Sequence, residues 1–323
     1  EFNHHNDFFT GRQGQEFASL QESYAYTYAL GGMQIINHPG QYWSLDNTYS
    51  ETQKNGPSWH ATNFETFPSL VGLEVYNQGN RRANDRILWD QILQRTMPAR
   101  NVFGYSGDDT HNNEQLFRNY NFMLMEDLTT EELKDAMRKG ESYFCYEPKG
   151  SGEGKAPRIT AINVNEKSKT ITIEANGLVH WIYATDKTSN AASSARSTIV
   201  GIGNTFCYDG YQGSYVRAYI TNMFGETCTQ PISFIDVQST NLEELAVEPL
   251  ALMLYPKPAS AYLNIFMPKA QVGELVKVYD LHGNVVMRHT IEGAVTTLPV
   301  ETLSAGMYIV QVGTHVGKFF KDL

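Results

Sequence analysis

The stretch "VFGYSGDDTH" at residues 102–111 runs from an apolar segment into a cluster of polar side chains. Val102, Phe103 and Tyr105 predict a short buried strand, because continuous apolar runs are typical of strands covered on both faces. In parallel sheets such strands deliver polar residues at their carboxyl ends, where α/β enzymes keep their sites. The stretch therefore predicts an α/β fold and makes Asp109 and His111 candidate site residues.

Alternation of helical and strand patterns extends over residues 1–147. Helical patterns cover 15–30 and 82–95, and apolar strands are expected at 33–37 and 70–77. This order favours a parallel sheet or a barrel. A last helix is expected in "LTTEELKDAMRKG" (128–140), where Thr129 with Glu132 suits a capping box and Gly140 suits a helix end.

Two further regions have the sequence pattern of short strands, with alternating apolar and polar residues. A Gly-, Pro- and Lys-rich segment at 148–158 precedes strands over 159–236, and a second linker at 236–252 precedes more strands over 250–323. We expect two all-β sandwich domains here. In the second, "LHGN" (281–284) between two apolar strands predicts a hairpin turn.

Composition excludes some classes of protein. The chain has 25 Lys and Arg against 35 Asp and Glu, a net charge of −10, which opposes nonspecific binding of nucleic acid. The spacing of the three cysteines excludes a zinc ribbon, and no apolar run is long enough to span a bilayer. The chain begins without Met, so we expect an upstream segment, which can include an export signal.

Polar residues of the metal-binding types follow several of the expected strands. Imidazole and carboxylate together suit zinc, manganese or iron, whereas calcium and magnesium favour oxygen alone. Ordinary roles compete at every position, since such residues also serve as turn caps, ion-pair partners or loop polar groups. The candidates are His38, Glu74, Asn77, Asp109 and His111 at strand ends, with Glu1, His4 and His5 at the chain start.

Three segments in order resemble the later motifs of the PHP (polymerase and histidinol phosphatase) family: "GGMQIINHPGQYW" (31–43), "VGLEVYN" (71–77) and "VFGYSGDDTHN" (102–112). The resemblance covers about residues 1–147. It implies the carboxyl-terminal part of a distorted β/α barrel, with two or three divalent metal ions in a complete family site. It also implies hydrolysis of phosphoesters.

The resemblance assigns roles residue by residue. His38 matches the His-Pro motif, while Asp109 and His111 match the Asp-x-His motif, so all three are implied metal ligands. The family's glutamate followed by histidine matches Glu1 and His5, and His4 competes with His5 for that role. The family's opening His-x-His motif and a further histidine do not occur in this chain, which can therefore build part of the metal site.

Three other residues have secondary roles in this interpretation. Asp108 stands where relatives often carry serine and is a candidate for supporting a ligand. Arg81 and Arg82 follow the 70–77 strand and could reach a substrate phosphate, because guanidinium groups match phosphate geometry; a solvated helix start is the favoured alternative.

The last region has a separate resemblance. "LYPKPASAYLNI" (254–265), "VKVYDLHGNVV" (276–286), "LPVETLSAGMYIVQV" (298–312) and "GKFFK" (317–321) resemble the C-terminal sorting domain of the type IX secretion system of Bacteroidetes-type bacteria. This implies that residues 250–323 engage that secretion machinery, and that the protein is secreted or displayed on the outer membrane. An adhesive β-sandwich is the alternative.

The combined hypothesis is a secreted or surface-displayed, metal-dependent phosphoesterase acting on an unidentified phosphorylated substrate. The alternative is a catalytically degenerate PHP scaffold that binds a ligand or a partner without turnover. A third hypothesis, an adhesin, requires an exposed aromatic surface; such residues more often lie in a sandwich core, and the candidates are Trp181, Tyr208, Tyr211 and Tyr215.

Overall fold

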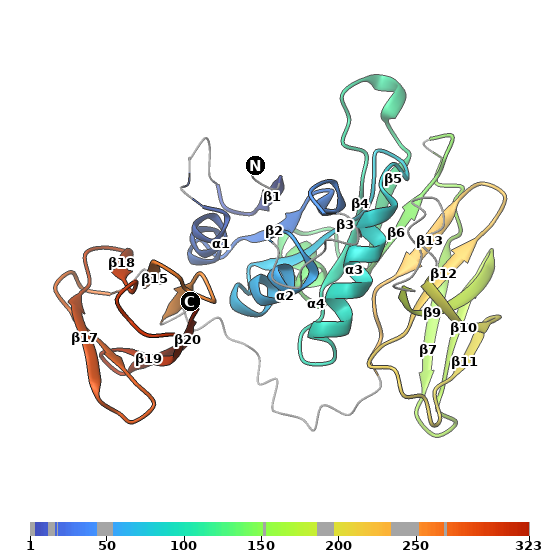
Figure 1. Cartoon of the computed structure of the whole chain (residues 1–323). Helices are drawn as coiled ribbons and strands as arrows, with labels where there is room; N and C mark the ends of the chain where they lie inside the picture. Colours follow the sequence, from blue (N-terminus) through green and yellow to red (C-terminus); the bar gives the residue numbers. More distant parts are fainter. Residues whose placement is uncertain are drawn as a thin grey trace. The chain divides into compact units, whose positions relative to one another are not determined.

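The protein is described by a computed structural model, covering residues 4–11, 17, 19–43, 54–150, 153–185, 197–233, 252–267 and 270–322 (Figure 1). Strands make up 40% of the structure and helices 19%, so the protein is rich in β-sheet and contains several sheets. The described residues divide into two compact units. One lies within Glu1–Asp7, Gln34–Glu65 and Leu70–Gln238, and the other within Phe8–Met33, Thr66–Ser69 and Ser239–Leu323.

The N-terminal sheet has four strands in chain order: β1 (His5–Phe8), β2 (Met33–Ile36), β3 (Leu70–Asn77) and β4 (Phe103–Gly107). Strands β2, β3 and β4 are parallel, with Ile36 opposite Leu73 and Asn77 opposite Gly107. Every residue of β2 and β3 is buried, as their continuous apolar runs predicted. Their carboxyl ends therefore meet at one edge of the sheet. Closure of this sheet into a barrel is not shown among the described residues.

Within the described ranges the helices are four α-helices and two short 3-10 helices: α1 (Leu20–Ala29), η1 (Pro39–Gln41), α2 (Pro57–Thr66), α3 (Ala83–Thr96), η2 (Asn113–Gln115) and α4 (Thr130–Lys139). The predicted ends of α4 are confirmed, because the Thr129 side chain accepts from the backbone N–H of Glu132 and Gly140 ends the helix with φ 70°. A Cβ on Gly140 would lie 2.1 Å from the Phe103 ring, so glycine is required there.

The largest sheet has six strands, ordered β10-β9-β12-β13-β6-β5. Its strands are β5 (Asn119–Met123), β6 (Ser142–Tyr146), β9 (Leu178–Thr185), β10 (Ser197–Ile202), β12 (Arg217–Thr221) and β13 (Glu226–Thr229). Because β6 pairs with β13, the sheet joins the two sides of the segment 148–158. The sequence predicts a domain boundary in this segment, and pairing between strands so far apart in the chain leaves no trace in the local sequence pattern.

A three-stranded sheet of β11 (Thr205–Cys207), β8 (Thr170–Ala175) and β7 (Ile159–Asn165) completes this β-rich part. The hydrophobic core here includes Trp181, Phe206 and Val216. Strands of this sheet and of the six-stranded sheet both contribute residues to it. Trp181 and Tyr215 are fully buried, and Tyr208 and Tyr211 pack against the same core. Trp181, Tyr208 and Tyr211 therefore belong to a sandwich core, and Tyr215 is buried with its hydroxyl on Asp90 of α3. None of the four provides the exposed aromatic surface that an adhesin requires.

A fully buried ion pair links helix α3 to strand β12. Arg217 donates from Nε to Asp90 Oδ1 (3.1 Å) and from Nη2 to Asp90 Oδ2 (2.9 Å), while Tyr215 Oη donates to Asp90 Oδ1 (3.0 Å). The Arg217 guanidinium also lies over the Trp89 ring, 4.9 Å from its centre. These contacts lie inside one compact unit and attach the helix of the α/β part to the β-rich part.

In the second unit, α1 begins at Ser19, whose side chain accepts from the backbone N–H of Glu22 (3.1 Å). The C-terminal region contains a sheet of β14 (Met253–Tyr255), β15 (Tyr262–Phe266) and β18 (Val295–Pro299), and a sheet ordered β17 (Val285–Thr290), β16 (Leu275–Tyr279), β19 (Gly306–Val312) and β20 (His315–Lys321). Residues from both sheets bury one core that includes Leu263, Val278 and Phe319. The predicted hairpin turn joins β16 to β17, with Gly283 at φ 84°.

Candidate functional site

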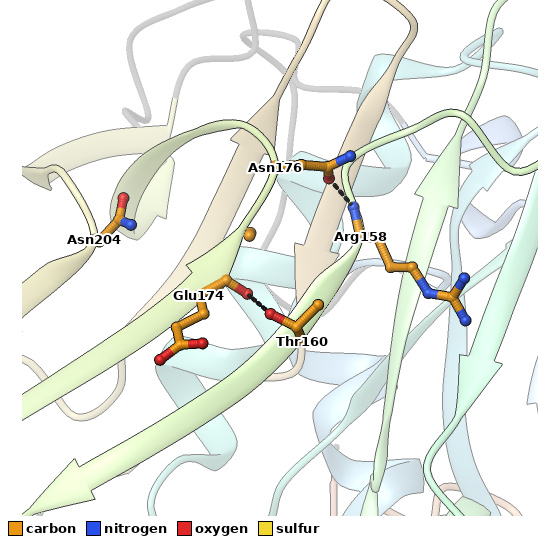
Figure 2. Close-up of a pocket in the computed structure, with 6 residues that line it drawn as sticks. Arg158, Thr160, Glu174, Asn176 and Asn204 are labelled. Atoms are coloured by element: carbon orange, nitrogen blue, oxygen red, sulfur yellow. Dashed lines mark hydrogen bonds between the residues drawn. The ribbon is translucent and has the colours of Figure 1, made fainter.

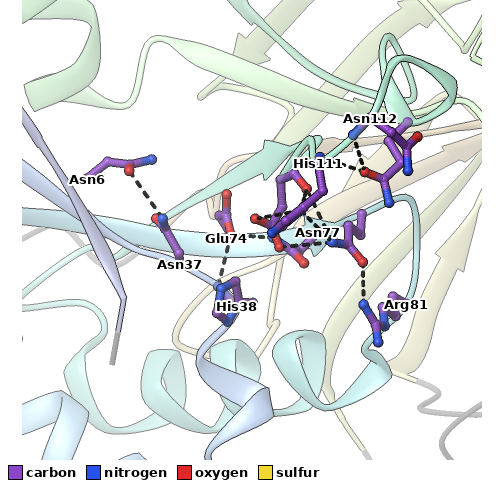
Figure 3. A network of polar contacts seen from close by, with 11 residues as sticks. Asn6, Asn37, His38, Glu74, Asn77, Arg81, His111 and Asn112 are labelled. Atoms are coloured by element: carbon purple, nitrogen blue, oxygen red, sulfur yellow. Dashed lines mark hydrogen bonds and ion pairs between the residues drawn. The ribbon is translucent and has the colours of Figure 1, made fainter. Parts of the chain in front are cut away.

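The carboxyl edge of the parallel sheet holds the segment that follows β2 in an unusual conformation. His38 is buried and left-handed, with φ 32°. Its backbone N–H donates to Glu74 Oε2 (2.9 Å), and the N–H of Gly40 donates to Asp85 Oδ1 (2.6 Å). Two buried carboxyl groups, one from β3 and one from α3, thus fix the loop that presents His38. Figure 3 shows the contact between Glu74 and His38.

Burial dominates the electrostatics of this edge. It raises the pKa of Glu74 to about 7, although hydrogen bonds from Asn77 and His38 oppose the shift. It also raises the pKa of Asp85 to about 8, against the hydrogen bond from Gly40. Burial lowers the pKa of His38, while the nearby Asp109 carboxylate acts in the opposite direction. Asp109 therefore lies close enough to act on both His38 and Glu74.

Asp109 and His111 lie in the loop after β4, beyond the end of the strand, and the His111 side chain is 68% exposed. Their side chains approach to 3.9 Å, and His111 Nδ1 lies 2.7 Å from the Asp109 backbone oxygen. Gln78 connects them, because its Nε2 lies 3.3 Å from both Asp109 Oδ2 and His111 Nδ1. Asp109 and Gln78 are both left-handed, with φ 45° and 46°, so two adjacent strand ends turn sharply at this edge.

Of the two histidines at the chain start, His4 has a ring contact with His38. The His4 ring lies 5.1 Å from the His38 ring in an edge-on arrangement. His5 lies in β1, and its Nε2 is 3.7 Å from Asp7 Oδ1. Glu1, implied as a ligand by the resemblance, lies outside the described residues.

The three secondary candidates, Asp108, Arg81 and Arg82, make different contacts. Asp108 accepts three backbone N–H groups, from Phe117 (2.6 Å), Arg118 (3.0 Å) and Asn119 (2.7 Å), so it fixes the loop before β5. Arg81 donates to the Gln78 side chain at the site. Arg82 lies near enough to act on His38 and Asp85, and its buried Nε has no hydrogen-bond partner among the described residues.

The fit of this edge to a metal ion is partial. No group of three or more His, Cys, Asp and Glu side chains in the described part of the chain is arranged to hold a metal ion. However, His38 Nδ1 is buried without a hydrogen-bond partner among the same residues, beside the Asp109 carboxylate. A buried imidazole nitrogen of this kind suits a ligand atom. Convergence of His38, Asp109 and His111 on one ion remains a prediction.

Sequence reasoning missed two residues of this edge. Asp85 is fully buried in α3, where the only available signal was an acidic residue in the first helical turn, which usually favours the helix dipole. Gln78 follows a strand that ends in Asn77, so its position after a strand was the available signal. Neither residue type is distinctive enough to be selected without the fold.

The raised carboxyl pKa values predict a pH dependence of stability. The ordinary values are 4.5 for Glu74 and 3.8 for Asp85, so between about pH 4 and pH 8 the folded chain keeps protons that the unfolded chain releases. Both groups therefore make folding less favourable as pH rises through that window. Relative to the natural protein, Asp85→Asn should gain more than about 1 kcal/mol between pH 5 and pH 8 in urea unfolding. Asp135→Asn, on an exposed helix face, is the control, and equal pH profiles for the two variants would contradict the assignment.

A separate shallow cavity of about 450 Å³ lies on the β-rich part and shares no residue with the His38 edge (Figure 2). It is lined by Arg158, Thr160, Glu174, Ala175, Asn176 and Asn204. Its polar side chains are all exposed, and the Asn176 side chain already accepts from the Arg158 backbone N–H (2.5 Å). We therefore place the candidate site at the carboxyl edge of the parallel sheet.

Comparison with known proteins identifies the C-terminal region. Residues 253–323 match the family described as the secretion system C-terminal sorting domain. No curated protein matches the chain. Among the described residues, none of the helices combines the length and apolar character needed to cross a membrane. The chain is thus a protein sorted by the type IX secretion system of Bacteroidetes, secreted or held at the cell surface.

Three solved structures show weak similarity. PorZ, an essential bacterial surface component of the type-IX secretion system of Porphyromonas gingivalis, is 13% identical with a TM-score of 0.20; the match covers 56% of this chain and 28% of that chain. The BSP domain of a biofilm associated protein is 15% identical with a TM-score of 0.16, and the match covers 51% of this chain and 28% of that chain. Dimeric latent PorU from Porphyromonas gingivalis is 12% identical with a TM-score of 0.18, and the match covers 53% of this chain and 20% of that chain. Because the TM-scores are this low, these matches carry no argument about function.

Proposed function

We propose that the N-terminal region is the carboxyl-terminal part of a PHP-type domain and that the protein is a secreted or surface-displayed, divalent-metal-dependent phosphoesterase. The observation that carries the proposal is the buried His38 Nδ1, which has no hydrogen-bond partner among the described residues and lies within electrostatic range of Asp109. A buried polar atom of this kind normally has a partner, and a metal ion would supply one.

The donor set defines which ion fits. His38, Asp109 and His111 would hold a zinc, manganese or iron ion, since imidazole and carboxylate suit these metals. When bound, such an ion lowers the pKa of a water and offsets charge on phosphoryl oxygens. Gln78 orients Asp109 by donating its amide N–H groups to the Asp109 carboxylate and backbone oxygens, which is the usual role of residues that support metal ligands.

The neighbouring arginine supports a phosphorylated substrate. Arg82 is partly buried near His38, and among the described residues its Nε has no hydrogen-bond partner and can donate to an incoming oxygen. A guanidinium group recognises phosphate through paired N–H groups, and partial burial strengthens that interaction. Arg81 instead holds the Gln78 amide. Arg81 is exposed just before α3, as a solvated helix start requires, so the proposal assigns the phosphate contact to Arg82.

Metal content tests the proposal. The protein is stripped with a chelator, dialysed against Zn²⁺ or Mn²⁺, and analysed by inductively coupled plasma mass spectrometry. We expect His38→Ala to lower the retained metal by about tenfold or more, since loss of a ligand weakens the hold on the ion. His282→Ala removes an exposed imidazole in the C-terminal hairpin turn and is the matched control. Equal retention by the two variants would argue against the site.

A further inference from the structure

The outer face of the β17-β16-β19-β20 sheet carries an arrangement that folding does not require. The inner face supplies Val276, Val278, Val310 and Phe319 to the core. Alternate residues of the same strands therefore point outward. Figure 1 labels β17, β19 and β20 within the C-terminal region.

Two cations stand directly opposite each other on this face. Lys277 of β16 pairs in register with Arg288 of β17. Like charges in directly opposed positions of an antiparallel pair are destabilising. In the described part of the chain no carboxylate lies within ion-pair distance of Lys277, Arg288 or the outward Lys318 of β20. The repulsion between Lys277 and Arg288 is therefore not offset by an ion pair within the described residues. Local conflicts of this kind often occur at binding sites.

Apolar side chains lie beside these cations. Met307 of β19 and Phe320 of β20 are directly opposed and are 37% and 46% exposed, and Val316 is 63% exposed. The register places them on the same face as the cations, because Gln311 stands opposite both Lys277 and Val316, and residues two apart along a strand share a face. This outer face, defined by Lys277, Arg288, Met307, Val316, Lys318 and Phe320, is mixed apolar and basic.

Charge complementarity identifies the partner. We propose that this outer face docks on an acidic protein surface with an apolar centre, belonging to the secretion machinery that the sorting domain engages. The three cations are held at fixed strand spacing, which suits a structured protein partner. Anionic membrane surfaces are usually bound by clusters of about four to eight basic residues, and the chain carries a net charge of −10.

A charge reversal separates docking from folding. Lys277→Glu places a carboxylate opposite Arg288, so the variant should melt no lower than the natural protein. In a bacterium with the type IX system, however, it should reduce the amount of full chain at the cell surface and in the medium by about tenfold, because like charges then meet at the interface. Lys277→Arg keeps the charge and should restore export. Lys167→Glu, in the exposed turn between β7 and β8, makes the same charge change elsewhere and should be exported normally.

Three outcomes would overturn the proposal. Export of Lys277→Glu at the natural level would show that the face is not used. An equal reduction in Lys167→Glu would assign the effect to net charge. Co-sedimentation of the purified full chain with phosphatidylglycerol vesicles, lost in Lys277→Glu, would assign the face to a membrane; we expect no co-sedimentation.

Discussion

Replacing Asp90 with Ala should lower the free energy of unfolding by about 3–5 kcal/mol, the usual result of removing one partner of a buried ion pair. The change leaves the Arg217 guanidinium buried without its carboxylate, and it removes the acceptor of the Tyr215 hydroxyl. The effect is large because Arg217 has an exposed side-chain fraction of 2% and Asp90 of 0%. Urea unfolding followed by tryptophan fluorescence measures it, since Trp89 packs against the pair.

Two comparisons make this prediction specific. Asp135→Ala removes an exposed carboxylate paired with Arg138 and Lys139, and it should change stability by less than about 0.5 kcal/mol. The double variant Asp90→Leu, Arg217→Met removes both charges and should be more stable than Asp90→Ala alone. A loss below about 1 kcal/mol for Asp90→Ala would mean that helix α3 is not fixed to β12 through this pair.

Local patterns predicted much of the fold. The buried strands β3 and β4 have the continuous apolar runs typical of parallel strands, and the ends of α4 follow from Thr129 and Gly140. The hairpin at 281–284 follows from its turn residues and flanking strands. These features depend on neighbours in the sequence, so short windows contain the necessary information.

Features that depend on distant segments were not predictable. The pairing of β6 with β13 unites residues on both sides of 148–158, a segment whose Gly and Pro content indicates a linker. At the site, the strand-end positions of His38 and Asp109 were readable, whereas the burial of Asp85 against Gly40 depends on how α3 packs. The role of Asp108 also depends on a return of the chain ten residues later, at Arg118.

Replacing Asp109 with Asn should lower the proposed phosphoesterase activity by about a hundredfold or more, because an amide lacks the charge that holds a metal ion. The fold should remain, for two reasons. Asn tolerates the left-handed backbone that Asp109 adopts at φ 45°. Its amide oxygen can also still accept from Gln78 Nε2, and the side chain is 32% exposed.

The adjacent carboxylate provides a matched control. In Asp108→Asn, one of the two oxygens that accept the backbone N–H groups of residues 117–119 becomes an NH₂ group. That variant should lose stability by about 1.5–3 kcal/mol while keeping turnover at temperatures where it is folded. The two neighbouring substitutions therefore have opposite expected effects, one on catalysis and one on stability.

The most direct measurement is the rate of phosphate release from an aryl phosphate by the full-length protein, with Zn²⁺, Mn²⁺ or Fe²⁺ added after chelation. The account predicts turnover that requires an added ion and falls by about a hundredfold or more in Asp109→Asn, with unchanged thermal melting. Turnover equal in the natural protein and Asp109→Asn, or absent from the natural protein with every ion, would contradict it.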